Sequence, residues 1–168
     1  AENTLDGSLF FDKGDTVNLV ATPNDGIATG EPTESEDMVV LNSAPDKPTI
    51  SLAGIDADGL DTETPAAGLH DLVCQVDSSG DADGDSLSFD FSWTVEGSEF
   101  LGVPEGTYIA GDTIGTTELA AEEEWGCTAT ATDSEGASTS SDEATIEVLC
   151  STGSSEECPG LSCDDILD

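Results

Sequence analysis

Three aspartates at two-residue spacing form the most chemically distinctive segment of the chain. Asp81, Asp83 and Asp85 supply carboxylates, and Gly84 between them permits a sharp backbone turn. Carboxylate oxygens presented by a loop are the ligands that Ca²⁺ prefers in proteins. The sequence therefore predicts a calcium site at these three aspartates, with Asp77 as a further ligand. The alternative is that the same side chains only form turns with their own backbone.

The spacing of these aspartates does not match an EF-hand loop. Ser86 stands where that loop needs glycine, and Ser92 stands where it needs a bidentate glutamate. Three other aspartates can contribute only if separate loops converge on one place: Asp56, Asp58 and Asp61.

Catalytic residue patterns are nearly absent from the sequence. The one histidine, His70, is expected at the start of a strand, and the chain has neither a Ser/His/Asp order nor a phosphate-binding glycine loop. Pairs of carboxylates are expected by chance among 38 acidic residues. The sequence therefore favours a protein that is not an enzyme.

The aspartates stand directly before the clearest strand of the chain. Between Leu87 and Val95 apolar and polar residues alternate without a break, which is the period of a strand with one buried face. Seven strands are expected in all, separated by Gly, Asp, Ser and Pro, at 48–53, 69–77, 86–96, 106–110, 114–120, 125–132 and 143–149. No helical period intervenes, so the expected class is an all-β antiparallel sandwich.

The charge of the chain limits its partners. Against 38 acidic residues stand two lysines, Lys13 and Lys47, which gives a net charge of −36. Such a surface repels nucleic acid and anionic lipid, and no apolar run is long enough to enter a membrane. Carboxylates also repel one another within a Debye length of roughly 8 Å. Bound calcium or a saline medium would relieve this repulsion, and the sequence leaves both open.

Five cysteines indicate an oxidising compartment, so we expect a secreted protein at the cell surface. Cys74 and Cys127 share the inward faces of two expected strands, and Trp93 lies between them in sequence. This is the Cys, Trp, Cys order of immunoglobulin-type sandwiches, and it predicts a disulfide between the two sheets.

The cysteines of the last segment are harder to pair from sequence. A local Cys150–Cys158 disulfide leaves Cys163 unpaired or bonded to another chain, and a Cys150–Cys163 pairing is the alternative. A zinc site is the weaker interpretation, because no histidine is near.

An internal repeat sets the domain organisation. Residues 9–26 align without a gap on residues 119–136, and each copy is followed by a Ser/Thr/Glu-rich segment and a short strand, 38–41 or 145–149. Residues 1–43 are therefore expected to be the C-terminal part of an incomplete sandwich module. The remaining divisions are a Pro-rich linker at 44–48, a complete module at 49–149 and a Cys-containing tail at 150–168.

The incomplete module needs β-partners, because a lone hairpin is marginally stable in water. The natural chain can extend upstream, a neighbouring molecule can supply the strands, or the segment can remain without a fixed partner. Val17 aligns with Cys127, so no equivalent disulfide would bind this hairpin to its missing strands. Non-covalent completion by another molecule is therefore allowed.

The chain resembles the tandem immunoglobulin-like or PKD-like repeats of large secreted bacterial surface proteins. The resemblance covers roughly residues 1–149 and rests on five segments: 22–26 (TPNDG), 42–45 (NSAP), 71–74 (DLVC), 81–93 (DADGDSLSFDFSW) and 125–127 (WGC). It implies a sandwich module that serves as a spacer, stalk or fibre, often with calcium and without catalysis. The truncated first module and the very acidic surface depart from the family pattern.

These observations predict an extracellular structural protein. We expect a homopolymeric filament or stalk subunit that assembles by strand complementation of the incomplete N-terminal module and is stabilised by cations. The alternative is a cell-surface adhesin that binds a glycan or a protein through its loops. An accessory domain of a secreted hydrolase is a third candidate.

Overall fold

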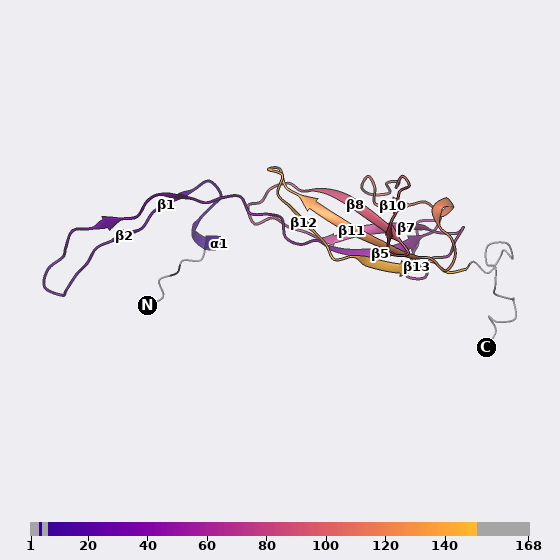
Figure 1. Ribbon diagram of the computed structural model, residues 1–168, viewed down its shortest axis with the longest axis horizontal. Helices are drawn as coiled ribbons and strands as arrows, with labels where there is room; N and C mark the ends of the chain where they lie inside the picture. The colour runs from indigo at the N-terminus through magenta and orange to yellow at the C-terminus, as the bar shows by residue number, and fades with distance from the viewer. Residues whose placement is uncertain (1–3, 5–6, 151–168) are drawn as a thin grey trace.

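A computed structural model of the chain describes residue 4 and residues 7–150. These residues form a protein of antiparallel β-sheets, which confirms the predicted all-β class. Two parts are visible in Figure 1: a sandwich of two sheets built from residues 49–147, and a long hairpin that projects from one end of it. The only helical turns in the described residues are α1 (Gly7–Phe10) and the 3-10 helix η1 (Thr116–Glu118).

The first sheet of the sandwich has the order β10-β7-β5-β6. Its centre is the pairing of β5 (Thr49–Ile55) with β7 (Asp71–Ser78), which runs from Thr49↔Ser78 to Ile55↔Asp71. The short strands β10 (Thr113–Ile114) and β6 (Asp61–Thr62) form its edges.

The second sheet is built on β8 (Ser88–Val95) and β11 (Glu124–Thr132), which pair from Trp125↔Val95 to Thr132↔Ser88. The other edge of β11 pairs with β12 (Ser138–Ser140) and β13 (Ala144–Glu147), whereas β8 meets only the short β9 (Ser98–Glu99). The alternation in β8 has the expected effect, because Trp93 is buried while Ser92 is exposed.

A disulfide between Cys74 and Cys127 joins β7 to β11 across the two sheets. This is the pair that the strand pattern predicts. The two sulfurs lie in a core of fully buried side chains that includes Leu72, Trp125 and Val148. Each such large apolar side chain stabilises the fold by about 1.5–3 kcal/mol, so the core at the centre of the sandwich fixes the positions of its end loops.

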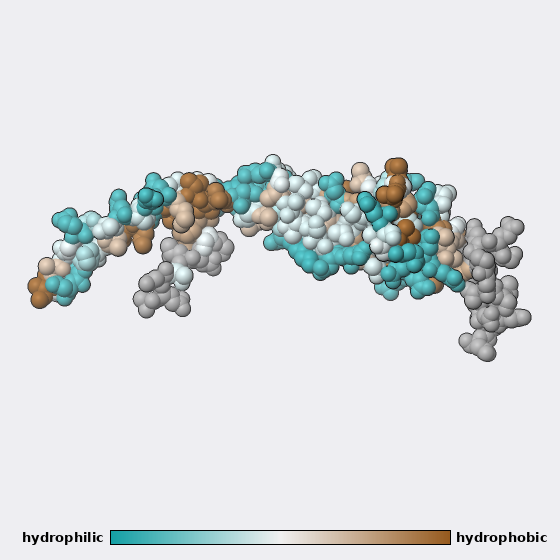
Figure 2. Space-filling model, viewed as in Figure 1, coloured by the Kyte–Doolittle hydropathy of each residue, from teal (hydrophilic) through white to brown (hydrophobic). Residues whose placement is uncertain are grey.

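Residues 14–40 form the projecting hairpin. In it β1 (Thr16–Val17) pairs with β4 (Met38–Val39), and β2 (Val20–Ala21) pairs with β3 (Thr33–Glu34). Figure 2 shows apolar residues on the surface along this hairpin. Leu19 and Met38 of the hairpin are 67% and 71% exposed. The hairpin lies apart from the core of the sandwich (Figure 1).

Two expected strands are different in the structure. The predicted strand 106–110 is a turn, because the buried carboxylate of Asp112 accepts the backbone N–H groups of Thr107, Tyr108 and Ile109. The predicted strand 114–120 ends at Ile114 and continues into η1. There the Asp71 Oδ1 atom accepts the N–H of Thr116 at 2.8 Å and turns the chain away from the sheet.

Candidate metal site at the joint of hairpin and sandwich

The predicted aspartates lie at the end of the sandwich where the linker enters. Strand β7 ends at Ser78 and β8 begins at Ser88, so the loop 79–87 lies at the same end as Thr49, the first residue of β5. Strand β11 ends at Thr132, which places the turn 133–137 beside that loop. Two loops of the sandwich therefore face the linker.

Asp81, Asp83 and Asp85 form one group in this loop. Their carboxylates can each present an oxygen within 4.8 Å of the other two. The Oδ1 atom of Asp81 accepts the N–H of Asp83 at 2.8 Å and that of Asp85 at 3.3 Å, and Gly84 at φ 76° completes the turn. The loop thus forms an Asx-type turn, and that turn gathers the three carboxylates.

The second carboxylate oxygen of Asp81, Oδ2, is buried and has no hydrogen-bond partner among the described residues. A buried oxygen without a partner costs free energy, and in a charged carboxylate the cost is larger. A hard cation that binds oxygen ligands would satisfy this atom. The chemistry of the three carboxylates therefore fits a metal ion, and the site can hold one.

The structure does not bring Asp77 into this group. Its side chain is exposed on β7, and its Oδ1 atom accepts the hydroxyl of Ser51 at 2.9 Å. Asp56 lies after β5 at the opposite end of the sandwich, where its carboxylate accepts the N–H groups of Asp58 and Leu60. The loops that carry these aspartates do not converge on the group.

Lys13 reaches the aspartate loop from the base of the hairpin. Its Nζ atom lies 2.5 Å from Oδ2 of Asp85, 2.9 Å from Oε1 of Glu135 and 3.1 Å from Oδ1 of Asn42. The hydrogen bonds to Asp85 and Glu135 raise the pKa of Lys13 well above its usual range. The hydrogen bond from Lys13 in turn lowers the pKa of Asp85. The ammonium group is thus a fixed cation beside the aspartates.

The linker adds hydrogen bonds to the same loops. Asn42 donates through Nδ2 to Oδ2 of Asp133 at 2.8 Å, and the N–H of Ser43 donates to Oδ2 of Asp83 at 2.6 Å. The hydrogen bond from Asn42 is the main reason that the pKa of Asp133 is lowered. One aspartate of the candidate metal site therefore also holds the linker.

Several residues of this joint were not identified as site residues from the sequence: Lys13, Asn42, Ser43, Asp133 and Glu135. One signal for Lys13 exists. It is one of only two cationic side chains in the chain, and it stands in an acidic turn between Asp12 and Asp15. Its partner Asp85, 72 positions away, was identified only as a metal ligand, and nothing in the sequence pairs it with Lys13.

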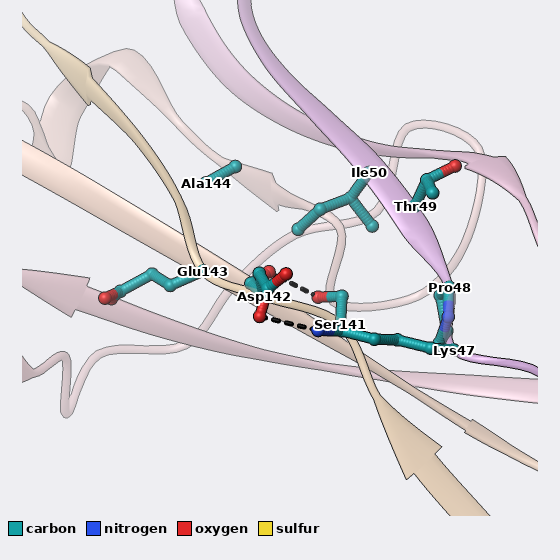
Figure 3. A pocket seen from close by; sticks show the side chains of 8 residues that line it. All are labelled: Lys47, Pro48, Thr49, Ile50, Ser141, Asp142, Glu143 and Ala144. Atoms are coloured by element: carbon teal, nitrogen blue, oxygen red, sulfur yellow. Dashed lines mark hydrogen bonds and ion pairs between the residues drawn. The ribbon is translucent and has the colours of Figure 1, made fainter.

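The second lysine lies in a separate shallow pocket of about 290 Å³ (Figure 3). Lys47 stands two residues before β5 and places Nζ 2.6 Å from Oδ1 of Asp142, in the segment between β12 and β13. Ser141 donates its hydroxyl to the backbone carbonyl of Asp142 at 2.7 Å. This pocket holds an exposed ion pair and presents no nucleophile paired with a base.

The remaining predicted residues have local roles or lie outside the described chain. Nδ1 of His70 accepts the N–H of Ala66 at 3.0 Å, so the only histidine closes a turn. Cys150 is disulfide-bonded. The predictions for Cys158 and Cys163 fall on residues outside the described ones.

Comparison with known proteins does not assign the chain to a family. No protein-family model matches it, and no curated protein matches it. Among residues 4 and 7–150, no helix combines the length and the apolar character that crossing a bilayer requires.

Proposed function

We propose that this protein is an extracellular structural subunit of a filament or stalk. In this proposal residues 49–149 are an immunoglobulin-like or PKD-like module, and residues 1–43 are the end of a second such module that a neighbouring molecule completes. One observation carries the proposal: the hairpin projects beyond the sandwich with its apolar residues exposed, as Figures 1 and 2 show. A surface of this kind is stabilised when another β-structure covers it.

The positions at which the chain enters and leaves the sandwich suit a rod. The linker enters beside the turn 133–137, through the bond between Asn42 and Asp133. The described chain leaves at the opposite end, where Leu149 and Ala66 form a parallel bridge. Modules that enter and leave at opposite ends can follow one another along an axis. A contact between the hairpin and a different surface of the next subunit propagates and gives a filament.

Calcium is the cation we assign to the joint. Three carboxylates in one loop and the unpartnered oxygen of Asp81 match the oxygen ligands that Ca²⁺ takes. Because Asp83 also accepts the N–H of Ser43, a bound ion would order the loop that holds the linker. The ion would therefore stiffen the angle between hairpin and sandwich.

Cations also matter for assembly as a whole. Subunits with a net charge of −36 repel each other, and bound or screening cations reduce that repulsion. The test is negative-stain microscopy together with sedimentation velocity, in sodium chloride and in calcium chloride of equal ionic strength. We expect fibres or large oligomers with calcium. Uniform monomers under every condition would contradict the filament proposal.

One observation favours the adhesin alternative. The loop after β9 exposes a cluster of apolar side chains, and Leu101 and Val103 in it are 86% and 88% exposed. Figure 2 shows brown residues protruding from the sandwich near β10. Such a patch is a feature of surfaces that bind a glycan or a protein. Monomers that bind a surface partner, and lose that binding on Leu101→Ser, would favour this second function.

A further inference from the structure

The projecting hairpin repeats the pairing of the last hairpin of the sandwich. In the sandwich, β11 pairs with β13 at Cys127↔Ala144 and with β12 at Thr130↔Ser140, so the register shifts by one residue between the two. In the hairpin, β1 pairs with β4 at Val17↔Met38 and β2 pairs with β3 at Val20↔Glu34, with the same shift. The sequence alignment of residues 9–26 with 119–136 predicts this equivalence for the first strand.

The hydrogen bonds at the shift are also the same. In the sandwich, Ser141 donates its N–H to the carbonyl of Ala129 at 2.8 Å, and its Oγ atom accepts the N–H of Ala129 at 3.0 Å. In the hairpin, Ser35 donates its N–H to the carbonyl of Leu19 at 2.8 Å, and its Oγ atom accepts the N–H of Leu19 at 2.9 Å. Each serine hydroxyl then donates to the carbonyl of the next residue, at 2.7 and 2.9 Å.

The two copies differ in what covers them. In the sandwich the remaining edge of β11 pairs with β8, and the inward residues Cys127, Ala129 and Ala131 are fully buried. Among the described residues no strand pairs with the corresponding edge of β1 and β2. The residues equivalent to Ala129 and Ala144 are Leu19 and Met38, and both are exposed.

An apolar groove marks the uncovered face. It has a volume of about 230 Å³ and is lined by Phe11, Val17, Met38, Val39 and Val40. Val17 is the residue that aligns with Cys127, and Met38 pairs with it across the hairpin. The groove therefore lies where the complete module has its inter-sheet core.

We propose that the free edge of β1 and β2, together with the Val17–Met38 face, is a docking surface for a β-strand of the β8 kind. Such a strand has apolar residues at alternate positions and belongs to a partial sandwich equivalent to residues 46–118 of this chain. It is donated by a neighbouring molecule. This inference rests on the proposed function, in which a neighbouring molecule completes the hairpin. It specifies which strand edge and which face the neighbour binds, and in which register.

The register follows from the repeat. Antiparallel pairs alternate between residues that face one neighbour and residues that face the other. The N–H of Leu19 is bound to Ser35, so the N–H groups of Thr16, Asn18 and Val20 point to the free edge. The docked strand accepts these three. Val17 replaces the cysteine at this position, so no inter-sheet disulfide forms there and the contact is non-covalent.

The test adds residues 46–118 to the full chain, in two arms. In one arm the segment is a separate polypeptide, and in the other it is fused directly before residue 9. The added segment carries Cys74→Ala, because that cysteine has no disulfide partner there. It also carries Phe91→Ala, because Phe91 faces Ala129 in the sandwich and would face the larger Leu19 in the hairpin. The readout is amide hydrogen exchange by NMR. We expect exchange at Thr16, Asn18 and Val20 to slow at least about tenfold.

Internal and matched controls make this readout specific. The N–H of Leu19 is already bonded and changes least. Met38→Asp places a carboxylate in the docking face and abolishes the protection. Thr16→Asp places the same charge outside the groove, on the strand face opposite to Val17, and leaves the protection of Asn18 and Val20 intact. Protection in both arms with this mutant pattern supports the proposal. Protection in the fused arm alone supports the docking surface but contradicts donation by a neighbour, and with it the proposed filament. No protection in either arm overturns the docking surface itself.

Discussion

Lys13 and Asp85 lie 72 positions apart in the sequence and form an ion pair, with Nζ 2.5 Å from Oδ2. Lys13 belongs to the base of the hairpin, and Asp85 belongs to the aspartate loop of the sandwich. Both side chains are largely shielded from solvent, at 25% and 18% exposure. The angle between the two parts of the molecule thus depends on one of the two cationic side chains in the chain.

Replacing Lys13 should loosen the joint. In Lys13→Met the carboxylates of Asp85 and Glu135 lose their counter-ion and repel one another, so the hairpin should sample a wider range of angles. Small-angle X-ray scattering should report this range, and the amide of Ser43 should exchange faster. Lys47→Met is the matched control, because it removes an equal charge from an exposed pair with Asp142. Equal effects of the two variants would show that only net charge matters.

The contribution of this pair should depend on pH with a defined sign. The pKa of Asp85 is lowered below its usual 3.8, so its stabilising effect is complete above that value and is lost as the pH falls through the folded pKa. The pKa of Lys13 is raised above 10.5, so its effect is complete below that value and is lost as the pH rises through the folded pKa.

The measurement compares wild type with Lys13→Met in thermal unfolding across this range. We expect a constant difference in melting temperature from about pH 5 to about pH 9, and a difference that shrinks as the pH falls below 3.8. A difference that grows as the pH falls would contradict the assigned pair.

Calcium should stabilise the wild-type protein through the aspartate loop. Ligand at about 100 times its Kd stabilises a folded state by about 2.7 kcal/mol. Asp81→Asn keeps the Oδ1 acceptor that forms the turn but removes the charge, and it should abolish the calcium-dependent rise in melting temperature. Asp77→Asn removes the same charge outside the group and should retain the rise. Sodium chloride at equal ionic strength separates binding from screening; an equal rise with either salt would rule out a specific site.

The inter-sheet disulfide should carry a large share of the stability. Closing a loop with a sequence separation of 53 stabilises the folded state by about 4 kcal/mol in the chain-entropy model. The double variant Cys74→Ala/Cys127→Ala should therefore unfold at a much lower denaturant concentration than wild type. Reduction of the wild-type protein should give a similar loss, and an unchanged unfolding midpoint in both experiments would contradict this role.

Asp112 should be essential for the turn that precedes β10. It is 1% exposed, and its carboxylate accepts three backbone N–H groups, which together with the bond from Thr113 hold its pKa low despite burial. Asp112→Ala should cost about 2–4 kcal/mol in unfolding free energy, because it leaves buried donors without a partner. Asp112→Asn keeps one acceptor oxygen and should cost less. Chemical denaturation measures both, and equal losses would indicate a packing effect alone.

The sandwich was largely predictable because its signals are local. The alternation around Trp93 gave the expected strand 86–96, and the structure has β8 at Ser88–Val95. The inward positions of Cys74 and Cys127 followed from the same two-residue period. The prediction of a strand at 106–110 was wrong. The carboxylate of Asp112, outside that segment, accepts backbone N–H groups of the segment and so competes with sheet pairing.

The joint was only partly predictable, because its contacts are distant in sequence. The three aspartates were identified from their spacing, and the structure groups them. The contacts of Asp83 with Ser43 and of Asp85 with Lys13 depend on where the linker meets the sandwich. Asp77 was expected with them, yet it points from the sheet toward Ser51. The direction of the Asp77 side chain is set by the alternation of faces along β7, and the prediction considered only the spacing of the aspartates.

The placement of the disulfide has a mechanical consequence. In the rod that we propose, tension would enter the sandwich at the linker and leave it near Leu149, at the far end. Cys74 and Cys127 enclose all of β8, β9 and β10 between them, so these strands cannot be drawn out while the bond lasts. An overstretched module would release only the segments outside this closed loop, and it would keep a folded template on which they can re-form after the load is removed.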